Sequence, residues 1–377
     1  NDGRWAVVMG NGYNSTNEDP VLIIQYLDGG TTSLRKIAAA TGNTGNGAAN
    51  GLSTPRLVDL NGDGIPDIAY AGDLKGNMWK FNIAHADPVN WGVAFSSANC
   101  TACTPFYTAT EKTNTTEAQP ITSAPNVRPS TSTPGMLVAF GTGQNLEVAD
   151  RTDTSPQSFY ALLDNTRYKL DTAAGANKGK ILVDTVAATP EAAGSGRAKL
   201  VERTFNSTAI AGEANSTGDS FWNMTTGQTA FSYTGTGAKK GWYFELPIAG
   251  ERVMQMAEFL SGSNILQIKS IVPASGDQVD ATQETCTPTA VPAKGYLTLM
   301  GIEQGLKPTV QLLDTDGDAI FNSAANKDKS TNRTTTSPEE ISLNGPGTQF
   351  RIGSDGKRRI VKEPPKPVST INWRQLQ

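Results

Sequence analysis

A recurring pair of short strands constrains the fold more than any other feature of this chain. In each copy an apolar strand ends in a small or glycine-rich step: WAVVMGNG (5–12), DIAYAGDLKG (67–76), MLVAFGTG (136–143) and GYLTLMG (295–301). A second strand ending in Asp or Asn then follows: VLIIQYLDGG (21–30), GNMWKFN (76–82), QSFYALLDN (157–165) and PTVQLLDTDG (308–317). Antiparallel units that bury their faces by stacking on neighbours build a β-propeller, and glycine after the first strand permits a tight turn. The sequence therefore predicts an all-β propeller and favours it over a β-sandwich whose strands are alike by accident.

The spacing of these strand pairs is irregular, and the segments between them are rich in Gly, Thr, Asn and Ser. We expect long surface loops or edge strands there, above all within 166–220 and 322–348, where few strands are indicated. The 377 residues can form a single large domain over 1–377. The chain enters a strand at Trp5 without a signal-peptide pattern, so we interpret it as a fragment of a longer polypeptide.

Charge and hydropathy argue against two classes of partner. The net charge is −4 and the basic residues are scattered, whereas phosphate binding needs a concentrated basic face, so we expect no nucleic acid. The strongest apolar run, Val21 to Ile24, is far shorter than the roughly 18 residues of a membrane helix. We therefore expect no transmembrane segment in this fragment.

Three cysteines suit an exported protein. Cys100 and Cys103 are spaced to close a small disulfide loop, which leaves Cys286 free or paired outside the fragment. The alternative is a zinc site made by these three cysteines and His85, the single histidine of the chain.

The most distinctive chemistry lies in LVDLNGDGIPDIAYAGDLKGNMWKF (57–81), where carboxylates crowd between two apolar runs. Oxygen donors at alternate positions, with a backbone carbonyl at the seventh, wrap a loop around one hard cation, and Ca²⁺ tolerates such a mixed shell. The sequence predicts a calcium site formed by the side chains of Asp59, Asn61, Asp63 and Asp67 and the carbonyl of Ile65. The loop is no complete EF-hand, because Tyr70 stands at position twelve and a strand follows in place of a helix. An exposed acidic turn is the alternative.

A second candidate calcium loop lies in LLDTDGDAIFN (312–322). Its donors would be Asp314, Asp316, Asp318, the carbonyl of Ile320, and Asn322. Ala319 replaces the usual glycine at position six, which burdens the turn, and an ordinary acidic hairpin turn is the competing interpretation.

Taken together, several phrases resemble the C-terminal β-propeller of the PilY/PilC family of type IV pilus biogenesis factors and tip adhesins. They run in order along the chain and thin between 166 and 230: GNGYNS, NGLSTPRLVDLNGDGIPDIAYAGDLKGNMWKFNI, PITSAPNVRP, MLVAFGTGQNLEVAD, QSFYALLDN, GWYFELPIAGERV, SIVPASGD and INWRQLQ. The resemblance implies a modified propeller of about seven blades, carried C-terminal to a variable adhesive region. It also implies a calcium loop on Asp59, Asn61, Asp63, Ile65 and Asp67, whereas the loop at 314–322 matches the family poorly.

The function implied by this resemblance is pilus assembly, calcium-linked control of extension against retraction, twitching motility and surface adhesion. The implied partners are minor pilins at the pilus tip and host or abiotic surfaces. The implied location is exported, at the cell surface and the outer membrane. One alternative is an FG-GAP-like propeller that binds a ligand or carbohydrate. A quinoprotein-like dehydrogenase is another, but the chain has one histidine and no evident nucleophile–base pair, so we predict no enzymatic activity.

Overall fold

The computed structural model describes residues 2–13, 18–30, 33–39, 50–95, 103–183, 196–211, 218–276, 291–321 and 328–364. Over these ranges the regular structure is almost entirely β, and the helices are short 3₁₀ turns at Pro88–Asn90, Ala149–Thr152, Gly196–Lys199 and Leu260–Gly262. The all-β prediction is confirmed.

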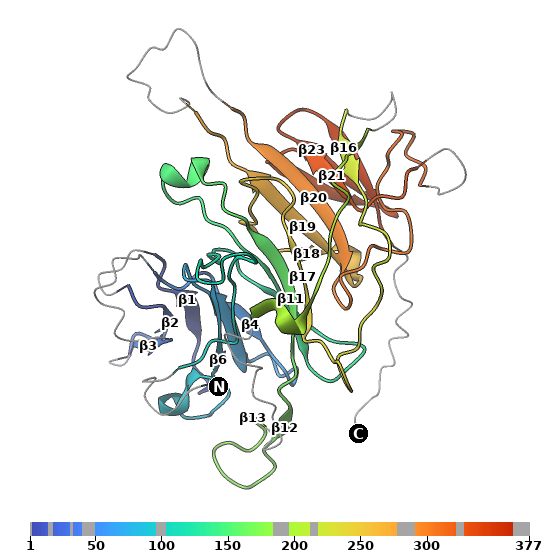
Figure 1. Ribbon diagram of the computed structural model, residues 1–377. Coiled ribbons are helices and arrows are strands. Elements are labelled where there is room, and N and C mark those ends of the chain that lie inside the picture. The colour runs from blue at the N-terminus through green and yellow to red at the C-terminus, as the bar shows by residue number, and fades with distance from the viewer. Residues whose placement is uncertain are drawn as a thin grey trace.

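Five sheets begin in turn along the chain, and the strands of the third and fourth interleave in the sequence (Figure 1). The first has the order β1-β2-β3, from Ala6–Gly10, Val21–Tyr26 and Leu34–Ala38. The second has the order β4-β5-β6-β7, with β8 also on β6, from Arg56–Val58, Ile68–Gly72, Asn77–Asn82, Gly92–Val93 and Tyr107–Thr108. The third has the order β14-β17-β11-β10-β9, from Leu200–Glu202, Gly241–Glu245, Ser158–Asp164, Met136–Gly141 and Asn126–Pro129.

The fourth sheet has the order β15-β16-β21-β20-β19-β18, from Ile210–Ala211, Ser220–Trp222, Arg333–Thr336, Lys294–Gly301, Ile265–Val272 and Glu258–Phe259. The fifth has the order β22-β23-β24, from Glu340–Gly345, Thr348–Gly353 and Arg358–Lys362. A separate hairpin pairs β12 (Tyr168–Leu170) with β13 (Ile181–Val183). These pairings are antiparallel except that β14 runs parallel to β17. Seven blades remain a prediction.

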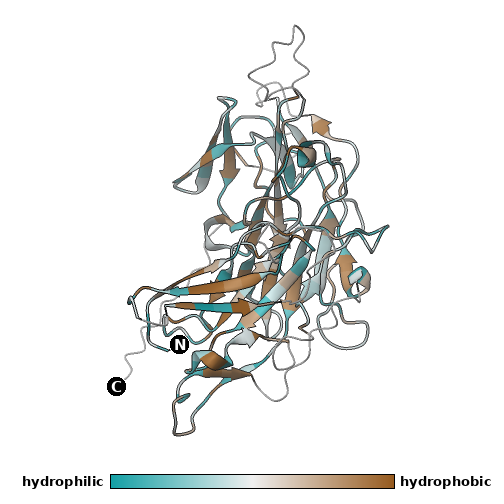
Figure 2. Ribbon diagram, turned by 90° about the vertical axis from the view of Figure 1, so that its left-hand side faces the viewer, coloured by the Kyte–Doolittle hydropathy of each residue, from teal (hydrophilic) through white to brown (hydrophobic). Residues whose placement is uncertain are grey.

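The central strands of the second, third and fourth sheets are buried on both faces because each of these three sheets packs against a neighbour on either side. In β5, Ala69 and Ala71 pack with the first sheet, whereas Ile68 and Tyr70 pack with the third. In β10, Val138 belongs to the core shared with the second sheet. Successive side chains of a strand point to opposite faces, so an unbroken apolar run supplies two cores at once. Figure 2 shows this concentration of apolar residues in the strands.

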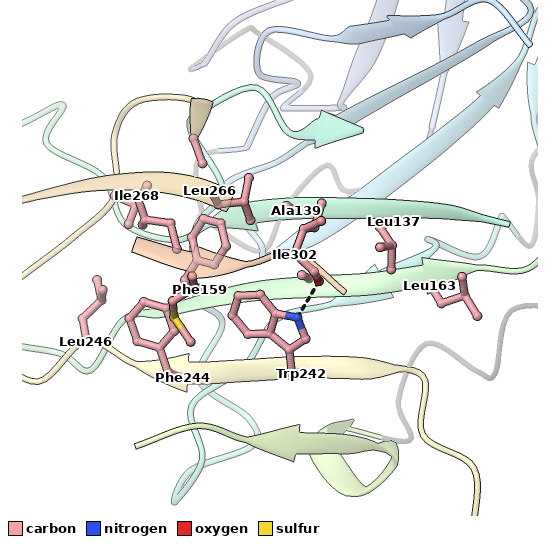
Figure 3. Close-up of a cluster of buried hydrophobic side chains, with 14 of the residues drawn as sticks. Leu137, Ala139, Phe159, Leu163, Trp242, Phe244, Leu246, Leu266, Ile268 and Ile302 are labelled. Atoms are coloured by element: carbon pink, nitrogen blue, oxygen red, sulfur yellow. Dashed lines mark hydrogen bonds between the residues drawn. The ribbon is translucent and has the colours of Figure 1, made fainter. Parts of the chain in front are cut away.

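The core between the third and fourth sheets is rich in aromatic rings (Figure 3). Trp242 of β17 is fully buried, stacks with Phe244, and donates its indole N–H to the carbonyl of Ile302 at 2.8 Å. Leu266 and Ile268 of β19 face these rings from the fourth sheet. Large buried rings with a satisfied indole give this interface a defined packing.

Short connectors tie successive sheets together. Leu52 accepts a hydrogen bond from the N–H of Gly12, and the N–H of Ser53 bonds to the carbonyl of Gly72. Pro120–Ile121 join the second sheet to the third in the same way, through Asp73 and Gly143, and Arg252–Val253 join the third to the fourth. We call these three dipeptides the connectors.

The connectors explain the glycine at the end of the first strand in three of the four pairs. A Cβ on Gly72 would lie 2.2 Å from Ile121 Cγ2, and one on Gly141 would lie 2.3 Å from Val253 Cβ. A Cβ on Gly10 would meet the carbonyl oxygen of Ser53 at 2.2 Å. These three glycines therefore provide room for a connector, whereas the sequence had suggested that they serve a tight turn.

Two sequence expectations need correction or comment. The prediction of a strand at 308–317 is wrong. In this segment Leu313 alone forms an isolated bridge, with Val361, and β20 pairs with β21 instead. The acidic turn and Pro308 leave this segment without a ladder of hydrogen bonds to a neighbouring strand.

Cys103 is disulfide-bonded, while Cys100 and Cys286 lie outside the described residues.

Candidate metal centre

The first acidic loop connects β4 to β5 and is closed at its base by a backbone hydrogen bond. The N–H of Asp67 donates to the carbonyl of Val58 at 2.9 Å. The intervening residues 61–64 are exposed, whereas Asp67 is fully buried at the start of β5. The loop therefore has a fixed inner end and an open outer end.

Side-chain oxygens fold this loop by accepting backbone N–H groups in a regular order. Asp59 accepts from Gly62 and Gly64, each at 2.7 Å. Asn61 accepts from the N–H of Asp63 at 3.1 Å, and Asp63 accepts from the N–H of Ile65 at 2.8 Å. Gly62 and Gly64 have φ of 78° and 84°, which suits glycine and lets the chain coil tightly.

Two carboxylates of this region differ in environment. Partial burial would raise the pKa of Asp59, but hydrogen bonds from the N–H groups of Gly64 and Gly62 lower it below its usual value. Asp59 is thus held as a carboxylate. Asp73 is buried and accepts from Asn77 and from the indole of Trp79 at 2.8 Å, so it supports the β5–β6 turn. It is not engaged with the loop.

The second acidic loop repeats the same order of hydrogen bonds. Asp314 accepts from Gly317 at 2.6 Å and from Ala319 at 2.9 Å. Asp316 accepts from the N–H of Asp318 at 3.2 Å, and Asp318 accepts from the N–H of Ile320 at 2.7 Å. The two loops therefore share one backbone design, although their sequences differ at position six.

A residue that the sequence did not suggest completes the second loop. Asn322, expected at position nine, lies outside the described residues. Asp328 is buried and accepts the N–H of Thr315 at 2.7 Å, just as Asp67 accepts the N–H of Leu60 at 2.9 Å in the first loop. No spacing rule could have found Asp328, because it lies beyond position nine of the loop, which is Asn322.

Carboxylates gather more closely in the second loop than in the first. Oxygens of Asp314, Asp316 and Asp328 lie within 4.8 Å of one another, and over the described ranges no other trio of acidic, His or Cys side chains does so. Carboxylates at such separations repel each other unless a cation or a proton intervenes. In the first loop the amide of Asn61 lies among the carboxylates and donates to Asp63 at 3.1 Å. Both loops thus present hard oxygen donors of the kind that Ca²⁺ prefers.

His85 has contacts of a structural kind. Its Nδ1 faces the N–H of Asp87 at 2.9 Å, and its Nε2 faces the side-chain amide of Asn177 at 2.9 Å. The imidazole thereby links the segment after β6 to the β12–β13 hairpin.

Consecutive sheets stacked face to face, with a hydrophobic core between each sheet and the next, define a protein of the β-propeller class. The family model described as the PilY1 beta-propeller domain matches residues 1–191, which is half of the chain. The chain therefore belongs to the PilY1 β-propeller family.

Curated relatives agree with this assignment. The type IV pilus biogenesis factor PilY1 of Pseudomonas aeruginosa strain PAO1 is 43% identical over 176 residues, a match covering 43% of this chain and 15% of the relative. A PilY1 homolog of Xylella fastidiosa is 35% identical over 170 residues, covering 44% of this chain and 11% of the relative. The matched part is thus a small share of these longer proteins.

The fold is shared with a solved structure. The crystal structure of the Pseudomonas aeruginosa PilY1 C-terminal domain superposes with a TM-score of 0.69 and 24% identity, over 97% of this chain and 70% of that one. Across the described ranges, no helix has the length and apolar character needed to cross a bilayer.

Proposed function

We propose that this chain is a calcium-binding module of a type IV pilus biogenesis factor, exported to the cell surface and acting at the pilus tip or outer membrane. Its role is to support pilus assembly, the balance of extension and retraction, twitching motility and adhesion to host or abiotic surfaces. Family membership supports the pilus role over an FG-GAP-like binding propeller or a quinoprotein dehydrogenase.

The observation that carries the calcium proposal is the shared hydrogen-bond order of the two acidic loops. In each loop the position-one carboxylate accepts the N–H groups of positions four and six. A buried aspartate accepts the N–H of the position-two residue in each loop: Asp67 from Leu60 and Asp328 from Thr315. Such folding holds oxygen donors together before a cation arrives, which lowers the ordering cost of binding. We assign Asp59, Asn61, Asp63, Asp67 and the Ile65 carbonyl to the first site. The second site comprises Asp314, Asp316, Asp318, Asp328 and the Ile320 carbonyl.

Calcium titration of the isolated chain tests the sites. We expect one ion for each loop, and each occupied site should stabilise the folded state by about 2.7 kcal/mol at a hundredfold excess over its Kd. Asp63→Ala should abolish the first site alone and Asp316→Ala the second alone. Asp171→Ala is the matched control, since Asp171 makes a similar local bond, to the N–H of Ala173 at 2.9 Å, outside both loops. A melting temperature that does not respond to calcium in protein verified as metal-free would refute the proposal.

The same variants in the full-length protein test the biological role. With Asp63→Ala we expect normal export, because stability is spread over stacked sheets, but loss of normal piliation or twitching. Asp171→Ala should behave as wild type. If calcium binding is lost while piliation, twitching and adhesion all stay normal, the first loop is structural only.

A further inference from the structure

A cavity of about 320 Å³ lies between the fourth and fifth sheets, away from the faces that join the first three. Its walls include Thr334 and Thr336 of β21, Leu297 of β20, and Arg351 and Arg359 of β23 and β24. Asp314 and Gly317 of the second acidic loop also reach it. Figure 1 shows β21 and β23 near one another on this side of the molecule. The volume suits a small ligand or the end of a larger one.

The strand register places two arginines side by side in this wall. Arg351 pairs directly with Arg359 across β23 and β24, so both side chains lie on the same face. Two like charges in this position are unfavourable unless acceptors compensate them. The two arginines differ in how far this is achieved.

Arg359 is fully engaged with carboxylates. It donates from Nε and Nη2 to Asp219, both at 2.8 Å, and from Nη1 and Nη2 to Asp355 at 3.2 and 2.7 Å. Its guanidinium therefore has little donor capacity left for a ligand.

Arg351 is engaged only in part. Its side chain is 1% exposed, and Nη2 lies 2.6 Å from Glu340 Oε2. Within the described part of the chain, none of its three guanidinium nitrogens has an aligned hydrogen-bond acceptor, so Glu340 compensates the charge only. Burial lowers the pKa of Arg351, and Glu340 offsets this only in part. A buried guanidinium with free donors is costly and would gain from an acceptor.

We propose that this cavity binds an oxyanion group, a carboxylate or a sulfate or phosphate ester, through the free donors of Arg351. Arg359 and its two carboxylates hold the neighbouring wall in place. The cavity adjoins the second acidic loop, because Asp314 and Gly317 line it, but the donors proposed for the oxyanion belong to Arg351 of β23 and not to that loop.

Isothermal titration with sodium sulfate, sodium phosphate and sodium glucuronate tests this in chelator-containing buffer at constant ionic strength. We expect saturable binding of at least one probe by the wild-type chain. Binding of glucuronate alone assigns a carboxylate ligand, and binding of sulfate or phosphate alone assigns an ester. No saturable binding of any of the three would overturn the proposal.

Two variants locate the binding. Arg351→Gln combined with Glu340→Gln removes the buried pair without changing net charge, and we expect binding about tenfold weaker or absent. Arg4→Gln combined with Asp28→Asn is the matched control, because it removes an exposed ion pair in the first sheet, and binding should stay within about twofold of wild type.

Arg351→Lys covers the case in which the double variant does not fold. Lysine keeps the charge beside Glu340 but lacks the planar set of donors, so binding should weaken several-fold while the fold persists. Binding equal to wild type in Arg351→Lys, or in a folded double variant, would contradict the assignment.

Discussion

Ala319 has a φ of 62°, close to the 84° that Gly64 has at the equivalent place in the first loop. A side chain in this left-handed region costs roughly 1–2 kcal/mol relative to an ordinary conformation. Ala319 accepts this cost while its N–H bonds to Asp314. One methyl group thus distinguishes two loops that are otherwise folded alike.

Exchanging these two residues should shift the two calcium affinities in opposite directions. Ala319→Gly should tighten the second site severalfold, because glycine adopts positive φ without strain. Gly64→Ala should weaken the first site by a similar factor, because alanine is strained at the positive φ of this position. A Cβ on Gly64 would meet no atom within 4 Å, so the substitution changes the backbone strain and not the packing. Calcium titration of each variant is the measurement. Affinities unchanged in both would show that this backbone conformation does not control binding.

Much of the folding of the first acidic loop was predictable from residue identity and spacing. The alternating donors and paired glycines specified the loop at 59–67, and the structure brings Asp59, Asn61 and Asp63 into one hydrogen-bonded turn. Asp328 was not predictable, because it lies outside the run of alternating donors and only the tertiary structure places it beside Asp314. The burial of Arg351 was not predictable from the sequence either, since it is set by the register of β23 and β24.

At the level of elements, the glycine that ends β5 is a site of close contact. Its neighbour Ile121 is fully buried, and the N–H of Ile121 bonds to the carbonyl of Asp73 at 2.9 Å. The apolar strand pairs correctly predicted β1, β5, β10 and β20, because strand patterning is local. The contact between glycine and connector is not local, so the sequence could not distinguish it from a turn.

Gly72→Ala should therefore destabilise the protein by about 1–3 kcal/mol through overpacking against Ile121. Gly92→Ala in β7 is the control, since a Cβ there meets nothing within 4 Å, and it should be nearly neutral. Combining Gly72→Ala with Ile121→Ala should cost less than the sum of the single changes. Thermal melting of the four variants measures this, and strict additivity would argue against the contact.

At the scale of the whole molecule, a buried ion pair joins the second sheet to the third. Lys80 of β6 donates to Asp164 of β11, which also accepts from the hydroxyl of Tyr70 at 2.6 Å. Burial alone would raise the pKa of Asp164, but the Lys80 ammonium and the bonds from Thr166 and Tyr70 lower it. The interface between these sheets thus depends on an ionised carboxylate.

Acid should weaken this interface in a defined direction. Because the pKa of Asp164 is lowered in the folded state, its contribution is present above the unfolded value near 3.8 and is lost as the pH falls through the folded value. Asp164→Asn should cost about 3–5 kcal/mol at pH 7, since it leaves Lys80 buried and unpaired. The stability difference from wild type should shrink below about pH 4. The double variant Lys80→Met with Asp164→Leu should lose less unfolding free energy than Asp164→Asn, because it leaves no buried charge unpaired. If the stability difference between Asp164→Asn and wild type did not change with pH, this account would be contradicted.

The connectors also bear on the order in which the chain can fold. The connector residue that packs against each of these glycines comes from later in the sequence. Ser53 packs against Gly10, Ile121 against Gly72, and Val253 against Gly141. During synthesis or export from the N-terminus, each sheet must therefore wait, incompletely packed, until the next connector emerges. A chain stalled before residue 120 would leave Gly72 without its contact to Ile121, and one face of the second sheet would be exposed to solvent. The nascent domain would then be most exposed to proteases and to aggregation before its third sheet forms.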